Sequence, residues 1–249
     1  MTPATSSQRP FPSASPNAIA YTEHPAIAEA VSPLRSYSIA LQALSLKVHP
    51  SAHSRLKRWI DLCGAVLGLG CFGLVLPWLA IAIRLDGKGS IFYRQKRCGL
   101  RGKSFYIWKL RTMVPNAEIL KKTVENQAKG FIFKNENDPR ITRVGRFLRK
   151  TSLDEFPQFW NVIKGEMSLV GTRPPTLDEV SRYRPHHWQR LQVKPGITGE
   201  WQAKGRSSVD DFETIVAMDM EYQARWSIAY DLRLIWMTIG AVIQRRGAC

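Results

Sequence analysis

The feature of this 249-residue sequence that most limits its fold is a long apolar run in its N-terminal half. Residues 62–83 carry no charged side chain, and a helix of that length can cross a hydrocarbon layer of about 30 Å. Basic residues flank the run on both sides, which favours keeping both flanks in the cytoplasm. Pro77 lies deep in the run, where proline bends a helix. Residues 51–88 are therefore predicted to form a re-entrant membrane helix hairpin, with a kinked transmembrane anchor as the alternative.

Charged residues at the start of this segment are assigned, with Pro77, to the membrane-associated part of the chain. Asp61 stands at the mouth of the run, and a carboxylate at membrane depth is costly unless it is paired. Lys57 precedes it by four residues, on the same helical face, and is its expected partner. Arg58 is one of the basic residues that precede the run. An unpaired N-terminal charge on the helix is the alternative for Asp61.

The charge of the chain points to an anionic partner. Lys and Arg number 36 against 20 Asp and Glu, a formal net charge of +16. Such an excess suits nucleic acid, an acidic membrane surface or phosphorylated substrates. No zinc, helix-turn-helix or RNA-binding signature is present, and the apolar run argues for a membrane, so no nucleic-acid partner is expected. Residues 1–50, rich in Ser, Pro and Ala, are predicted to be a disordered tail.

Two strands are predicted after the apolar run, over residues 90–95 and 104–113. The connection contains Gly99 and Gly102, so a hairpin is expected. Alternation in the second strand places Lys109 and Arg111 on one face. Two cations on one strand face could meet a phosphate, although solvated surface charges are the alternative.

The most informative stretch is residues 151–175, which contains the adjacent carboxylates Asp154 and Glu155. Ser152 and Glu155 match a capping box that would begin a helix. Pro157 disagrees with that register unless the helix begins at Asp154. In either case the two carboxylates lie at a helix N-terminus, which attracts phosphate and favours the ionised carboxylate of a nucleophile or metal ligand. An ordinary N-cap aspartate is the alternative.

Two later loops could contact phosphate. Pro174 forces Arg173 into an extended conformation, with its guanidinium ready for a bidentate contact. The segment KPGITG at 194–199 is a glycine-bearing turn, followed by Trp201, Gln202 and Arg206, which could hold a nucleobase and its phosphates. A plain surface turn is the alternative.

Two amphipathic helices complete the prediction. Residues 141–150 carry arginines at 143, 146 and 149, and residues 232–246 are apolar with arginines at their ends. Both suit a membrane surface, with a solvated helix face as the alternative for the arginine stripe. The predicted fold is α+β and mainly helical, with a re-entrant membrane helix hairpin, a small β-hairpin and amphipathic interfacial helices around a cytoplasmic catalytic core at 89–249.

Several stretches occur together in the order typical of one family. They are LKRWID at 56–61, YRQKRCGLRGKSFYIWKLRTM at 93–113, SLDEFPQFWNVIKGEMSLVGTRP at 152–174 and KPGITG at 194–199. Over about four fifths of its length the chain resembles the bacterial sugar transferases known as polyprenyl-phosphate hexose-1-phosphate transferases, or monotopic phosphoglycosyl transferases. The short N-terminal region makes it similar to the minimal form of that family.

The resemblance implies a reaction and a place for it. Asp154 would attack the β-phosphate of a UDP-sugar, release UMP and carry the phosphosugar until a polyprenyl (undecaprenyl) phosphate attacks it. Mg²⁺ would be the cofactor, with Asp154 as its protein ligand. The enzyme would act at the cytoplasmic face of the bacterial inner membrane, in the first membrane step of exopolysaccharide or glycoconjugate synthesis; a homo-oligomer is left open.

The residues assigned to the site fall into two groups. The catalytic group is Asp154, Glu155, Lys109 and Asp219. The substrate-binding group is Arg111, Arg173, Lys194, Gly196, Thr198, Gln202 and Arg206. Three residues depart from the family pattern: Leu76, Cys98 and Glu200, of which Glu200 would add a negative charge near the nucleotide. A rival interpretation, a non-catalytic basic membrane adaptor, explains the charge and the apolar run but not an Asp–Glu pair beside an Arg-Pro loop.

Overall fold

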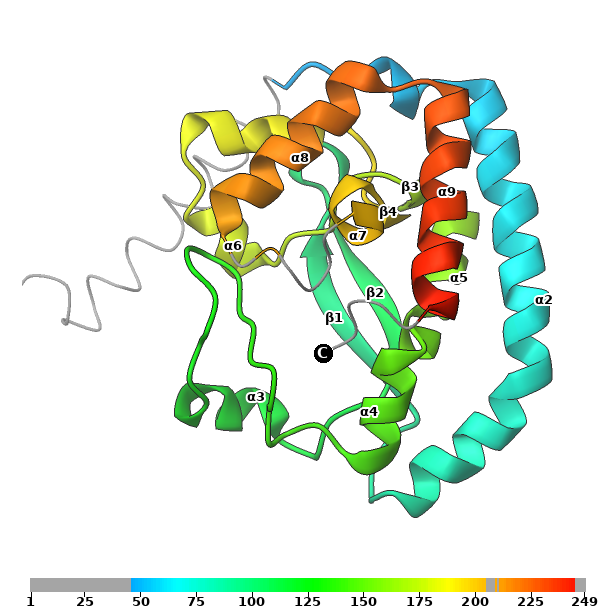
Figure 1. Ribbon diagram of the computed structural model, residues 1–249, viewed down its shortest axis with the longest axis vertical. Coiled ribbons are helices and arrows are strands. Elements are labelled where there is room, and N and C mark those ends of the chain that lie inside the picture. The colour runs from blue at the N-terminus through cyan, green and yellow to red at the C-terminus, as the bar shows by residue number, and fades with distance from the viewer. Residues whose placement is uncertain (1–45, 205–208, 210, 245–249) are drawn as a thin grey trace, which may run out of the picture. The chain divides into compact units, whose positions relative to one another are not determined.

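Residues 46–204, 209 and 211–244 are described by the structure, a computed structural model (Figure 1). Most of the expected tail, residues 1–45, lies outside them. The described part is mainly helical, as predicted, and it contains two small sheets, of which the β-hairpin was expected and the parallel pair of strands was not. Its α-helices are α2 (Arg55–Leu85), α3 (Ala117–Leu120), α4 (Arg143–Lys150), α5 (Gln158–Ile163), α6 (Leu177–Ser181), α7 (Glu200–Lys204), α8 (Phe212–Arg225) and α9 (Ile228–Ile243). The strands are β1 (Phe92–Cys98), β2 (Ser104–Leu110), β3 (Ser168–Val170) and β4 (Gly196–Thr198), and 3-10 helices η2 to η6 span Pro50–Ala52, Leu100–Gly102, Lys121–Thr123, Leu153–Glu155 and Pro185–Gln192.

The apolar run forms one continuous helix, α2, of 31 residues. Ser54 caps its N-terminus by accepting a hydrogen bond from the backbone N–H of Lys57. Pro77 lies inside the helix, and Figure 1 shows α2 changing direction in its lower part. The helix continues through the bend, so the segment is a single bent helix rather than two separate helices. Among the described residues, α2 is the one helix long and apolar enough to cross a membrane.

One face of α2 is apolar and exposed. Leu67, Leu74, Trp78 and Leu85 are 70%, 78%, 74% and 84% exposed. The opposite face packs against α5 and β3, where Gly68 lies directly beneath the ring of Phe159. An exposed apolar face of this size is unusual on a protein surrounded by water, and it fits a lipid environment.

Both ends of α2 are attached to the rest of the described chain. Near the N-terminal end, Arg58 donates hydrogen bonds to the carbonyls of Val162 and Ile163 at 2.6 and 2.8 Å. At the other end, Arg111 donates to the carbonyl of Ile83 at 2.6 Å. The two ends are therefore held by one folded body.

The expected pair of Lys57 with Asp61 is wrong. The Nζ of Lys57 lies 2.6 Å from Asp231 Oδ2 in α9. Asp61 accepts hydrogen bonds from Ser168 Oγ and the Leu169 N–H at 2.9 and 2.8 Å. Both side chains are buried in protein, where closer partners on other elements are within reach.

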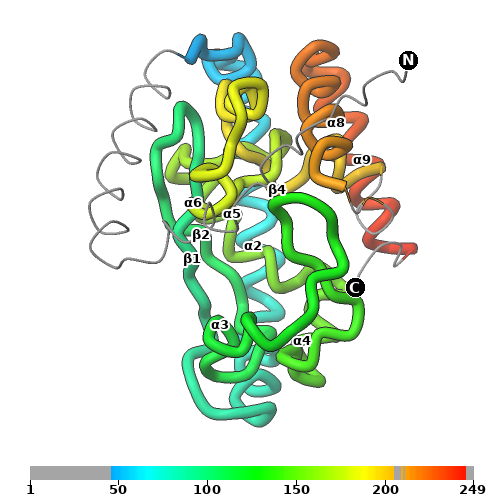
Figure 2. Tube along the Cα trace, turned by 90° about the vertical axis from the view of Figure 1, so that its left-hand side faces the viewer, coloured from blue at the N-terminus to red at the C-terminus, as the bar shows by residue number. Residues whose placement is uncertain are grey.

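The predicted β-hairpin is confirmed. Strands β1 and β2 pair antiparallel, from Phe92 opposite Leu110 to Cys98 opposite Ser104. Phe105 and Ile107 are buried in a cluster with Ala65 of α2. The hairpin therefore lies against α2 and α5, and Figure 2 shows it on one side of the domain, with α8 and α9 on the other.

The second sheet brings two distant loops together. Strands β3 and β4 pair parallel, Ser168 with Gly196 and Val170 with Thr198. A Cβ atom on Gly196 would lie 2.2 Å from the backbone nitrogen of Gly171, so only glycine permits this approach. The close crossing places the Arg173 loop beside the start of α7.

The two expected interfacial helices exist, and their contact with a membrane stays a prediction. In α4, Arg143 and Arg146 are exposed, but Arg149 turns inward and donates to Thr112 Oγ1 at 3.0 Å. The predicted three-arginine stripe is therefore wrong at Arg149. In α9, Trp236 and Ile243 are 71% and 75% exposed.

Candidate functional site

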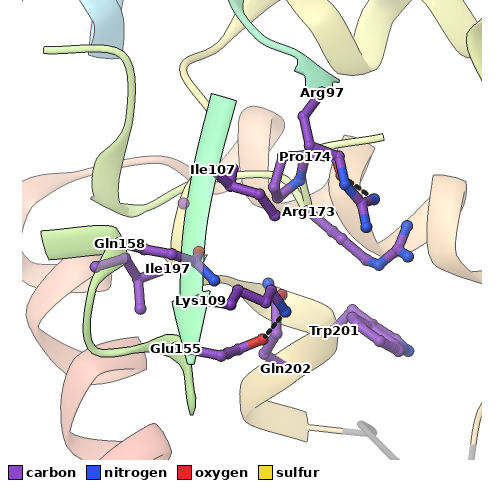
Figure 3. A pocket seen from close by; sticks show the side chains of 11 residues that line it. Arg97, Ile107, Lys109, Glu155, Gln158, Arg173, Pro174, Ile197, Trp201 and Gln202 are labelled. Atoms are coloured by element: carbon purple, nitrogen blue, oxygen red, sulfur yellow. Dashed lines mark hydrogen bonds and ion pairs between the residues drawn. The ribbon is translucent and has the colours of Figure 1, made fainter. Parts of the chain in front are cut away.

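A pocket opens where the β-hairpin, α5, the loop after β3 and the start of α7 meet (Figure 3). It contains both sequence-predicted and unexpected residues. Those lining it are Arg97, Ile107, Lys109, Glu155, Gln158, Arg173, Pro174, Gly196, Ile197, Trp201 and Gln202. Of the predicted site residues, the structure brings Lys109, Glu155, Arg173, Gly196 and Gln202 together here.

Lys109 and Glu155 form an ion pair in this pocket. The Lys109 Nζ lies 2.9 Å from Glu155 Oε1. Lys109 comes from β2 and Glu155 from the 3-10 helix Leu153–Glu155, and the pair joins the two elements (Figure 3). Both side chains are about one quarter exposed, so a substrate can reach them.

The predicted capping box is wrong. Ser152 adopts a left-handed conformation with φ 56° and makes no cap hydrogen bond with its side chain. The carboxylates lie on a short 3-10 turn, and α5 begins only at Gln158, with Pro157 at its N-cap. Pro157 separates the two short helices because it cannot donate a backbone hydrogen bond.

Asp154 lies beside the pocket but is not one of its lining residues. It is 6% exposed, whereas Glu155 reaches the pocket wall. Arg149 is its cationic neighbour. Burial lowers the pKa of Arg149 below its ordinary value, and the charge of the Asp154 carboxylate opposes that shift. The two adjacent carboxylates thus face different surroundings.

Arg173 is held in the pocket by a carboxylate and an aromatic ring. Its Nη1 lies 3.1 and 3.2 Å from the two oxygens of Glu179, and its guanidinium is 6.0 Å from the centre of the Trp201 ring. Burial alone would raise the pKa of Glu179, but Arg173, Arg97 and Arg190 lower it below its ordinary value. Glu179 is therefore a fixed negative charge that positions Arg173.

Sequence reasoning missed Arg97 and Gln158 as lining residues, whereas Trp201 was expected to help hold a nucleobase. For Arg97 the signal was available. It pairs with Phe105 in the hairpin, and cross-strand partners point to the same face of a sheet. Because Phe105 and Lys109 share a face by alternation, Arg97 belongs on that face as well.

Three predicted residues lie away from the pocket lining. Arg111 donates to the carbonyls of Ile83, Gly87 and Lys88 at the end of α2. The Thr198 hydroxyl lies 2.5 Å from that of Thr238 in α9. Lys194 lies near Arg58: burial and the Arg58 charge lower its pKa.

Two further predictions concern residues outside the pocket or outside the described chain. Asp219 is 1% exposed in α8 and lies 2.7 Å from Arg190 Nε, so the structure places it in a buried ion pair. Arg206 is not among the described residues.

Glu200 does not bring its charge to the pocket. Its side chain is fully buried, accepts a hydrogen bond from the Tyr230 hydroxyl at 2.6 Å and pairs with Lys204. The expected negative charge near a nucleotide is therefore directed toward Tyr230 of α9 and compensated by Lys204 of its own helix, α7.

Among the residues that the structure describes, two groups offer possible metal ligands. Asp154 and Glu155 offer hard carboxylate oxygens, which suit Mg²⁺ when phosphate oxygens complete its shell. His186, His187 and Glu213 also place ligand atoms within 4.8 Å of one another. However, His187 Nδ1 accepts the N–H of Arg184 at 3.0 Å, so its Nε2 carries the proton that faces Glu213 at 2.9 Å. A metal needs a free lone pair there, so this cluster is a hydrogen-bonded support.

Comparison with known proteins supplies a family. A model described as bacterial sugar transferase matches residues 52–245. The galactosyl transferase CpsE of Streptococcus agalactiae is 48% identical over 206 residues, covering 82% of this chain and 46% of the relative. The undecaprenyl-phosphate galactose phosphotransferase of Salmonella typhimurium is 39% identical over 219 residues, covering 86% and 46%. The exopolysaccharide production protein ExoY of Rhizobium meliloti is 38% identical over 198 residues, covering 77% and 87%. The chain spans about half the length of the first two relatives.

Proposed function

The chain belongs to the bacterial sugar transferase family, and we propose that it moves a sugar-1-phosphate from a UDP-sugar to polyprenyl phosphate. The observation that carries this proposal is the pocket, in which Lys109 and Arg173 converge beside the adjacent carboxylates. Phosphoryl transfer is catalysed mainly by positioning and by neutralising charge, and these side chains provide both. Relatives named for undecaprenyl-phosphate and galactose support the two substrates.

The proposed reaction has two steps at one carboxylate. An oxygen of Asp154 attacks the β-phosphorus of the UDP-sugar, the bond from that phosphorus to the bridging oxygen breaks, and UMP leaves with the electron pair. An oxygen of the polyprenyl phosphate then attacks the same phosphorus, and the bond to Asp154 breaks. Aspartyl-phosphate intermediates are a known form of covalent catalysis. Lys109 stabilises the phosphate charge and holds Glu155 at the pocket wall.

Magnesium is the proposed cofactor. Asp154 and Glu155 would supply its protein oxygens, and the ion would neutralise charge on the diphosphate. Asp219, by contrast, is proposed to act through Arg190 as a support for the domain rather than by touching the substrate, because its carboxylate is buried in that pair.

The exposed apolar face of α2 supports a reaction at a membrane surface. We propose that α2 enters and leaves the cytoplasmic leaflet of the bacterial inner membrane. Attachment of both of its ends to the same body supports this, since a spanning helix would carry its two ends to opposite sides.

This topology can be tested with cysteine reporters. His53 and Lys88 are exposed and flank α2, and His53→Cys leaves the Ser54 cap intact. In a background without the native cysteines, both reporters should react only with reagents on the cytoplasmic side. Replacing Pro77 with leucine should favour a straight crossing. Reaction of either reporter from the periplasm in the otherwise native sequence contradicts the re-entrant arrangement.

A release assay tests the activity itself. The purified full chain, with Mg²⁺ and polyprenyl phosphate, should release UMP from one or more of UDP-galactose, UDP-glucose and N-acetylated UDP-sugars. A membrane adaptor without activity would release none from the whole series. The screen also identifies the sugar, which depends on a few pocket contacts.

A further inference from the structure

Among the described residues, three cations line the pocket, and Arg97 differs from the other two. Lys109 faces Glu155 at 2.9 Å, and Arg173 faces Glu179 at 3.1 Å. The Arg97 guanidinium donates instead to uncharged acceptors: Nε and Nη2 to Gln95 Oε1 at 3.1 and 2.6 Å, and Nη1 to the Pro174 carbonyl at 2.9 Å. Its charge is therefore held in place without being directly neutralised by these bonds.

Arg97 lies beside a second guanidinium. Figure 3 shows the side chains of Arg97 and Arg173 pointing toward the same end of the pocket. Burial and the charge of Arg173 lower the pKa of Arg97 to about 10, while the carboxylates of Glu179 and Glu155 act in the opposite direction. Like charges held together in a cleft are unfavourable in the empty protein, and a bound anion removes that cost.

The spacing of the two guanidiniums is set by the backbone. The N–H of Cys98 donates to the Pro175 carbonyl at 2.9 Å, and Arg97 forms a β-bridge with Thr176. The end of β1 is thus joined to the segment that follows Arg173. Such pre-organisation is typical of a site that stabilises charge, because no movement is needed when the ligand arrives.

The two ends of the pocket differ in what they offer. Lys109 and Glu155 lie at one end, next to Asp154 in the chain, and the arginine pair lies at the other (Figure 3). If the transferred phosphoryl group meets Asp154, the second phosphate of the diphosphate extends toward the arginines. A guanidinium matches two phosphate oxygens at once.

We propose that Arg97 is a further substrate-binding residue, which together with Arg173 holds the phosphate that stays on the nucleoside. This inference rests on the proposed function and deepens it. The pair binds the α-phosphate in the substrate and stabilises the charge that develops on the departing UMP.

The test measures UMP binding without turnover. Arg97→Gln removes the charge and Arg97→Lys keeps it without the fork. Dissociation constants for UMP and for uridine are measured by calorimetry on the full chain in detergent micelles. We expect UMP to bind about 10- to 100-fold more weakly to Arg97→Gln, with Arg97→Lys between it and the native protein. Uridine binding should not change, because uridine has no phosphate.

Arg94→Gln is the matched control. Arg94 lies on the same strand but faces away, over the Tyr106 ring at 5.3 Å, so its loss changes the net charge equally without touching the pocket. Equal UMP affinities for Arg97→Gln and Arg94→Gln would overturn the proposal. If Arg97→Gln fails to fold, the same comparison with Arg97→Lys decides.

A structural role for Arg97 gives a different pattern. A residue that only ties β1 to the Arg173 loop would lower the melting temperature on substitution and weaken uridine and UMP alike. We expect Arg97→Gln to melt within about 3 °C of the native protein, because relief of repulsion offsets the lost hydrogen bonds. Failure of the native protein to release UMP from any UDP-sugar would refute the enzyme, whereas unchanged UMP affinity in an active enzyme refutes only this inference.

Discussion

Replacing Asp154 with asparagine should lower turnover by about 10⁴-fold or more, the scale seen when a catalytic nucleophile is lost. Asparagine keeps the shape of the side chain and removes its charge. Asp154 is 6% exposed, and asparagine fits its buried position because the two side chains have nearly the same size. UMP release is the measurement, with the melting temperature of the variant as the check on folding.

The covalent step can be seen apart from turnover. Without polyprenyl phosphate, a covalent route should release UMP in a burst of up to one per enzyme and leave a phosphosugar on the protein. A direct attack by the lipid phosphate would release nothing until the lipid is added. Intact-protein mass after exposure to UDP-sugar and Mg²⁺ distinguishes the two routes. An active enzyme with no added mass would refute the covalent intermediate.

Glu155→Gln is the variant to compare with Asp154→Asn. It removes the charge of the neighbouring carboxylate, which lines the pocket wall where Asp154 does not. Glu155 is engaged by Lys109 at 2.9 Å, which suits a positioning or metal-binding role better than nucleophilic attack. We expect Glu155→Gln to turn over slowly and still accumulate the adduct. In the native enzyme, a phosphosugar that maps to Glu155 would show that the roles of the two carboxylates are reversed.

Local patterns in the sequence predicted the elements that surround the site. The uncharged run becomes α2 although it contains four glycines, and Pro77 lies inside the helix without ending it. The hairpin turn follows from its glycines, and Gly102 indeed has φ 72°. Gly165, with φ 78°, follows the end of α5, a position where glycine commonly ends a helix. Each of these features depends on residues within a few positions of one another.

Pairings across the fold could not be predicted in this way. Lys57 has a carboxylate four residues away, yet its partner Asp231 is 174 residues distant. Asp219 was placed by resemblance at the catalytic centre, while the structure places it with Arg190, 29 residues earlier. Which partner a buried charge finds is decided by packing of whole elements, and no local spacing encodes that.

The strongest expected effect on stability is at Lys57. Its ammonium lies 2.6 Å from Asp231 Oδ2 and 3.0 Å from the Val170 carbonyl. The Tyr222 hydroxyl and the Trp226 indole N–H complete the shell of Asp231 at 2.9 and 3.1 Å. This buried cluster joins the start of α2 to β3 and α9, directly before the loop that carries Arg173.

Lys57→Met should therefore lower the free energy of unfolding by about 3–5 kcal/mol, because it leaves the Asp231 carboxylate buried without its cation. Arg55→Met, at an exposed position two residues earlier, removes the same charge and should cost less than about 0.5 kcal/mol. The double variant Lys57→Met with Asp231→Leu removes both charges and should be more stable than Lys57→Met alone. Denaturant unfolding in micelles, followed by tryptophan fluorescence, measures all three. If Lys57→Met and Arg55→Met lose equal stability, the ion pair contributes nothing, and α2 is held to the domain by apolar packing.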